Sequence, residues 1–176
     1  MKYSSLSEIL QIDSSRAVVD VATGFVGSDE MLFDEVLDLA VNAKYPINMR
    51  AARVVEQSVR RYAVFASQRM NYIVTVSISH SNDGVKRSFL KIIDRFLPDN
   101  IPEDLLGLVI HNCFQKLNGI EPVAVKTYSI DCLLKILKRE PDLKHELIES
   151  LENQIGLNTL SLDRKIKKTL KLIDGK

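Results

Sequence analysis

The sequence contains few of the residues on which secreted and membrane architectures depend. Among its 176 residues there is no tryptophan, and Cys113 and Cys132 are the two cysteines. Both cysteines lie inside apolar helical patterns, which favours a reducing, cytoplasmic compartment over a disulfide framework. Glu8 and Asp13 precede any apolar run long enough for a signal peptide. The longest uncharged stretch, 70–82, contains several polar residues and is far shorter than the roughly 20 residues of a membrane span, so neither secretion nor membrane insertion is expected.

Sequence features of catalysis and metal binding are also absent. The seven glycines are scattered singly, without a phosphate-binding loop, a nucleophile elbow or an HExxH pattern. His80, His111 and His145 fall on three different expected helices, away from metal-ligand spacings. His111 and Cys113 are two residues apart, so on a helix they point about 200° away from each other and cannot share an ion. The sequence therefore predicts a protein that is not an enzyme and has no cofactor and no metal site.

Helical periodicity is what the sequence has in abundance. Apolar residues recur at steps of three and four, as in the series Leu105, Val109, Cys113 and Leu117. With 45% hydrophobic and 27% charged residues, the composition is that of a folded globular chain. Short connectors with proline, glycine or asparagine predict antiparallel neighbours in an all-α fold. Ten helices are predicted, at about 4–11, 14–26, 29–43, 47–65, 67–80, 83–96, 102–118, 121–139, 142–155 and 160–173.

The predicted helix 67–80 has a competing interpretation. Its segment from Ile73 to Ile78 is β-branched and alternates as a strand would. A single strand between helices would leave its backbone groups without partners, whereas Met70, Ile73, Val74 and Ser77 share one helical face. We therefore expect a helix.

A local pattern recurs in every second helix, where a small or apolar residue precedes a basic one and apolar residues follow at helical spacing. The steps between the basic residues are 34, 36, 40 and 38 positions, one helical hairpin each. The pattern is clearest at Glu121–Lys126 and weakest in the first and last copies. The aligned basic residues are Arg16, Arg50, Lys86, Lys126 and Arg164.

This repeat resembles those of the HEAT and armadillo-like families. The resemblance spans essentially the whole chain and implies one domain over residues 1–176, an α-α superhelix of about five antiparallel helical hairpins. The two blurred end copies are expected to be capping repeats. The last predicted helix, 160–173, is amphipathic and basic, which suits a cap, or alternatively a grip on a partner.

Charge is distributed unevenly along the chain. Residues 1–49 contain three basic and eight acidic residues, a net charge of −5, whereas residues 50–95 contain nine basic and three acidic residues, a net charge of +6. In HEAT-type proteins the second helices line the concave surface, so the resemblance implies a basic band there. The candidate binding residues of this band are Arg50, Arg53, Arg60, Arg61, Lys86, Arg87 and Lys91.

Two structural alternatives compete with a binding role for these cations. Arg50, Lys86 and Lys126 stand where HEAT-like repeats place a ladder of contacts between repeats. For Arg53, Arg60, Arg61 and Lys91, a merely solvated helix face is an equal alternative.

The sequence therefore favours a non-enzymatic scaffold or adaptor that binds an unidentified protein partner through its concave surface, and the basic centre favours an acidic partner. The alternative is DNA binding, because HEAT-like alkylpurine DNA glycosylases use a basic concave groove. The chain has no tryptophan and a net charge of only +1, both of which argue against that alternative. A third possibility is a helical subunit that works only within an oligomer.

Overall fold

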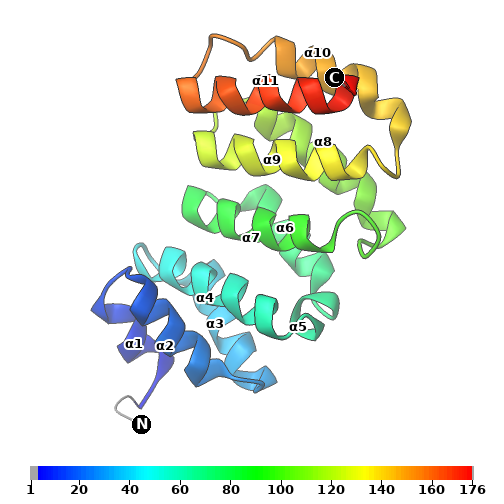
Figure 1. Ribbon diagram of the computed structural model, residues 1–176. Helices are drawn as coiled ribbons and strands as arrows, with labels where there is room; N and C mark the ends of the chain where they lie inside the picture. Colours follow the sequence, from blue (N-terminus) through cyan, green and yellow to red (C-terminus); the bar gives the residue numbers. More distant parts are fainter. Residues whose placement is uncertain (1–3, 176) are drawn as a thin grey trace. The chain divides into compact units, whose positions relative to one another are not determined.

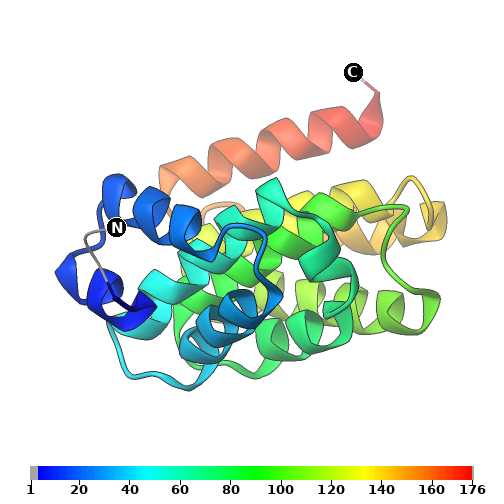
Figure 2. The same ribbon diagram turned by 90° about the horizontal axis from the view of Figure 1, so that it is seen from below.

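The computed structural model describes residues 4–175, and every regular element in that range is helical (Figures 1 and 2). All ten predicted helices are present, including the contested one, which forms a helix from Met70 to Ser79. The elements in chain order are α1 (Leu6–Ile12), α2 (Arg16–Val26), α3 (Glu30–Asn42), α4 (Ile47–Arg61), α5 (Val64–Ser67), α6 (Met70–Ser79), α7 (Asp83–Phe96), α8 (Glu103–Asn118), α9 (Val123–Ile136), the 3₁₀ turn η1 (Pro141–Leu143), α10 (Lys144–Glu152) and α11 (Leu160–Asp174).

Several helix starts are fixed by polar side chains that accept hydrogen bonds from the first amides. Ser15 accepts from Val18 at the start of α2, and the Asp29 carboxylate accepts from two amides of α3. The Asn82 side chain does the same for α7, accepting from the amide of Val85 at 3.2 Å. The caps of α2 and α3 place the first residue of each helix one or two positions later than predicted, whereas α7 begins at the predicted residue.

The predicted helix 47–65 is wrong in its last turn. α4 ends at Arg61, Tyr62 leaves helical geometry, and the four-residue helix α5 follows. The break turns Phe65 into the interior, where it stacks on Phe33 with ring centroids 4.4 Å apart. Burial of an aromatic ring outweighs the cost of ending a helix without a breaker residue, and so short-range sequence signals did not reveal it.

The chain divides into two compact units, one up to Ile92 and one from Ile93 onward, and each is described by itself. In the first unit, α1 contacts α2, α3 contacts α4, and the second helices α2 and α4 contact each other. Figure 2 shows the blue helices α1 and α2 side by side. Stacking second helix on second helix is the packing expected of helical-hairpin repeats.

The second unit repeats this arrangement. α8 contacts α9 and α10 contacts α11 within hairpins, while α9 lies against α11 and α8 against α10 between hairpins. Figure 1 shows α9 and α11 side by side. The interior of the second unit consists of apolar side chains from all four helices, among them Val109, Leu117, Ile130, Leu151 and Ile166.

Candidate binding surfaces

α4 provides four of the seven predicted binding residues because its two faces differ sharply. Ala51, Ala52 and Val55 are fully buried on one face. The arginines occupy the other face, and the structure divides them into two groups.

Arg50 and Arg53 are engaged within the first unit. The Arg50 guanidinium donates from Nε to Ser14 Oγ at 3.0 Å and from Nη1 to the carbonyl oxygen of Leu10 at 2.8 Å. Arg53 Nη1 donates to the carbonyl oxygen of Ser14. Both arginines therefore satisfy backbone carbonyls at the end of α1 and in the connector to α2, and both are only half-exposed.

Lys86 and Lys91 are also paired within the first unit. Lys86 Nζ lies 2.9 Å from Asp83 Oδ1 in the first turn of its own helix. Lys91 Nζ lies 3.1 Å from Glu56 Oε2, which joins α7 to α4. Glu56 is buried, so its carboxylate depends on this lysine for compensation.

Arg60, Arg61 and Arg87 form the second group, for which the structure shows no hydrogen bond or ion pair with any described residue. Arg60 and Arg61 are exposed in the last turn of α4, and Arg87 is half-buried on α7. Cations in a last helical turn interact favourably with the helix dipole, a small effect that does not require a partner. We call Arg60 and Arg61 the α4 arginine pair.

Of the predicted ladder residues, Arg50 contacts a carbonyl oxygen of the preceding hairpin, Lys126 contacts an amide oxygen of the following hairpin, and Lys86 pairs within its own helix. A ladder of ion pairs between repeats lies at other positions. Each ladder pair joins the second helices of neighbouring hairpins, and its members are 34 to 41 residues apart in the sequence. The pairs are Glu56–Lys91 in the first unit, and Asp94–Lys135 and Asp131–Lys165 in the second. Acidic and basic residues one repeat apart are the signal that would have identified them.

The terminal helix α11 packs on α9 and α10 through the buried side chains of Leu162 and Ile166. Lys165 pairs with Asp131 of α9. These contacts fit the predicted role of α11 as a cap. Lys167 and Lys168 are exposed, and the alternative role of α11 in binding a partner stays a prediction.

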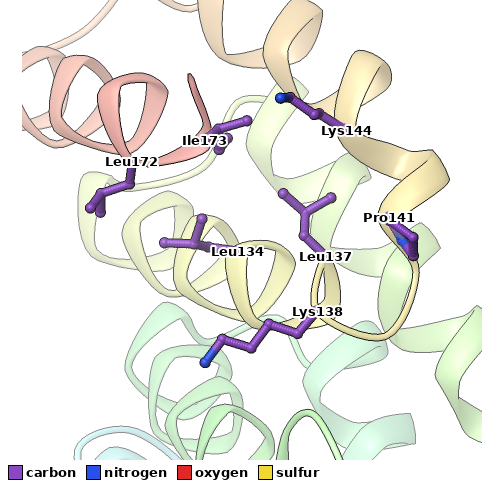
Figure 3. Close-up of a pocket in the computed structure, with 7 residues that line it drawn as sticks. All are labelled: Leu134, Leu137, Lys138, Pro141, Lys144, Leu172 and Ile173. Carbon is purple, nitrogen blue, oxygen red and sulfur yellow. The ribbon is translucent and has the colours of Figure 1, made fainter. Parts of the chain in front are cut away.

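Two hollows in the second unit were not foreseen from the sequence. The first, which we call the apolar pocket, has a volume of about 260 Å³ and lies where the end of α9, η1, the start of α10 and the end of α11 converge (Figure 3). Figure 3 shows leucine and isoleucine side chains lining it and two lysines at its edge. Its lining residues are Leu134, Leu137, Lys138, Pro141, Lys144, Leu172 and Ile173.

The second hollow, which we call the Lys126 pocket, has a volume of about 300 Å³ and lies between the connectors α8–α9 and α10–α11. Lys126 itself is only 5% exposed, and its Nζ donates to Gln154 Oε1 at 2.6 Å. Burial lowers the pKa of Lys126, and the Glu121 carboxylate opposes that effect. The lining residues are Asn118, Gly119, Ile120, Glu121, Lys126, Gln154, Leu157 and Asn158.

The histidines and cysteines lie apart from these hollows. His80 Nε2 lies 3.2 Å from the carbonyl oxygen of Val41, whereas His111 and His145 are exposed. Cys113 and Cys132 are both buried and unoxidised in neighbouring helices. In the described part of the chain, no three His, Cys, Asp or Glu side chains gather as a metal site would require.

Among residues 4–175, no helix combines the length and apolar character that crossing a membrane requires.

Stacked antiparallel hairpins with second helices against second helices define a helical-repeat protein. Comparison with protein families identifies the kind of repeat, because the HEAT repeat domain matches residues 4–173. The chain therefore belongs to the HEAT repeat family, as its sequence pattern predicted. Comparisons with curated proteins and with solved structures returned no match.

Proposed function

We propose that this chain is a non-enzymatic scaffold that binds an acidic segment of a protein partner through the α4 arginine pair. HEAT repeats present helix faces to other proteins, and their stacking provides surface rather than an active site. The observation that carries the proposal is that Arg60 and Arg61 are exposed and have no intramolecular partner among the described residues.

Charge supports an acidic partner. Two adjacent guanidinium groups in solvent attract carboxylates at long range and speed the encounter with them. Arg87 adds a third cation of the same unit without an intramolecular partner among residues 4–175. Arg50 and Arg53 serve a different purpose in this proposal, because their donors already hold the α1–α2 connector.

The test is a comparison of two charge-reversed variants. Arg60→Glu with Arg61→Glu removes the proposed contact, and Lys167→Glu with Lys168→Glu makes the same change of charge on exposed residues of α11. Wild type and both variants are used to recover partners from extracts of the native host. We expect a stoichiometric partner that is retained by the lysine variant and lost by the arginine variant.

Two outcomes would count against the proposal. Equal loss of the partner in both variants would mean that binding follows net charge or the α11 lysines and is not specific to the arginine pair. The second outcome comes from a separate binding experiment. Fluorescently labelled glutamate-rich peptide, duplex DNA and single-stranded DNA are each titrated with the protein at low and high salt. If DNA binds with a steep salt dependence and the peptide does not, released counterions identify a nucleic-acid surface instead.

A further inference from the structure

The connector between α8 and α9 brings three ionisable side chains into one small region of the second unit. Lys116 and Lys126 are each only 5% exposed, and Lys116 Nζ lies 4.0 Å from Glu121 Oε1. Lys116 therefore has a carboxylate partner, whereas Lys126 forms no ion pair with a described carboxylate. Burying an uncompensated charge is costly, so a protein that keeps one has a use for it or an anion to pair with it.

Lys126 is the cation of this group that lines the pocket. Its ammonium donates to the neutral amide oxygen of Gln154, and no described carboxylate lies within 4.0 Å of it. An ammonium group has three donor hydrogens, so donors remain for a ligand. Its lowered pKa has the same physical origin, because burial disfavours the charged form unless an anion approaches.

The chain around Lys126 is held in place before any ligand arrives. The Asn158 side-chain amide donates to Gln154 Oε1 at 3.2 Å and to the Gln154 carbonyl at 3.0 Å. Gly119 makes the turn tight, since a Cβ there would stand 2.8 Å from the carbonyl oxygen of Gln115. Gly156, with φ +80°, allows the other connector to turn in a conformation that side chains disfavour.

The rim of the pocket is apolar although its floor is polar. Ile120 is fully exposed in the α8–α9 connector, and Leu157 is 73% exposed in the α10–α11 connector. Both residues line the pocket beside the buried cation. The volume of about 300 Å³ stands at the low end for ligand sites, which suits one side chain rather than a cofactor.

We propose that the Lys126 pocket binds the carboxylate of an aspartate or glutamate side chain in a protein segment, with apolar neighbours of that side chain resting on Ile120 and Leu157. A single negative charge matches the one ammonium group of Lys126, whereas the second charge of a phosphate would add to the repulsion from Glu121. The apolar rim favours a peptide over a free acid. This site belongs to the second unit and does not depend on the α4 arginine pair.

The test uses two blocked tripeptides, acetyl-Leu-Glu-Leu-amide and acetyl-Leu-Gln-Leu-amide, titrated into the full chain while backbone amide NMR signals are followed. We expect saturable shifts of the amides of Gly119, Ile120, Leu157 and Asn158 with the glutamate peptide, at a dissociation constant of about 1 mM. The glutamine peptide, which lacks the charge, should bind at least about tenfold more weakly.

Two variants change the pocket in opposite directions. Lys126→Met keeps the aliphatic stem and should weaken glutamate-peptide binding by about tenfold or more, while Lys168→Met, the same change on exposed α11, should have no effect. Glu121→Gln removes the competing carboxylate and should strengthen binding, which keeps the test decisive if Lys126→Met does not fold.

Three results would overturn the proposal. These are equal affinity for the two peptides, unchanged or weaker affinity in the Glu121→Gln variant, and shifts of the same amides by inorganic phosphate but not by the glutamate peptide. None of these results depends on the partner-capture experiment with the Arg60 and Arg61 variant. The Lys126 pocket proposal and the α4 arginine pair proposal can therefore fail independently.

Discussion

Arg50 and Arg60 lie on the same helix and carry the same charge, yet we expect their removal to have different consequences. Arg50 donates two hydrogen bonds, at 3.0 Å and 2.8 Å, to Ser14 and to the Leu10 carbonyl oxygen. Arg60 is exposed and has no such contact with a described residue. Arg50→Met and Arg60→Met are therefore a matched pair, because each removes a guanidinium group and keeps an apolar stem.

The magnitude follows from the hydrogen bonds. A hydrogen bond that involves a charged group contributes about 1.5–3 kcal/mol, and water competes for a half-exposed guanidinium. We therefore expect Arg50→Met to lower the free energy of unfolding by about 2 kcal/mol in total. With a urea dependence of about 2 kcal/mol per molar, the midpoint of unfolding falls by about 1 M. Arg60→Met should change the free energy of unfolding by no more than about 0.5 kcal/mol.

The assay is urea unfolding followed by far-UV circular dichroism, combined with hydrogen exchange of individual amides. Because Arg50 holds the end of α1, the loss of protection should be largest at the amides of α1. Equal destabilisation by Arg50→Met and Arg60→Met would refute the reasoning. A loss spread evenly over both units would also contradict it.

Three further predictions concern other buried or paired groups. Arg69→Leu removes a guanidinium group that lies 2.9 Å from Asp34 Oδ2. Because Asp34 is exposed, the loss of free energy of unfolding should be only about 1 kcal/mol, measured as a lower urea midpoint. An unchanged midpoint would contradict this prediction. Burial lowers the pKa of Lys126, so the unfolded chain binds this proton more tightly than the folded chain. Wild type should therefore gain stability relative to Lys126→Met as pH rises toward the ordinary lysine pKa of 10.5. Urea midpoints of both proteins at neutral and alkaline pH measure this gain, and a stability difference that does not change with pH would refute the prediction. The hydrogen bond to Cys113 and complete burial raise the pKa of Cys132 well above its ordinary value. Iodoacetamide should therefore label Cys132 readily only after the chain unfolds. Rapid labelling of Cys132 in the native protein, detected by mass spectrometry, would contradict this prediction.

Much of the fold could be predicted because one-sided burial leaves a regular trace in the sequence. The segment 67–80 illustrates this, since its β-branched residues suggested a strand but its buried residues follow helical spacing. The break after Arg61 could not be predicted in the same way. It arises from the stacking of Phe65 on Phe33, a contact between residues of different hairpins that leaves no breaker residue behind.

The candidate sites were less predictable than the fold. The pattern of small, apolar and basic residues identified Arg50, Lys86 and Lys126 as equivalent, yet the structure gives each a different partner. Arg50 bonds to the preceding hairpin, Lys86 pairs within its own helix and Lys126 bonds to the following hairpin. A repeat fixes the position of a side chain on its helix, whereas its partner depends on which residue the neighbouring helix presents there.

The sequence by itself determined that the chain is helical, that its helices pair into HEAT-type hairpins, and that its second to third hairpins are rich in cations. These properties follow from periodicity and composition, which are local. Only the tertiary structure decided which cations have partners and where the chain is hollow. Lys91 pairs with Glu56, 35 residues away in the sequence, and Leu134 and Leu172 line the same apolar pocket. Contacts over such separations depend on the packing of whole helices, and no short pattern encodes them.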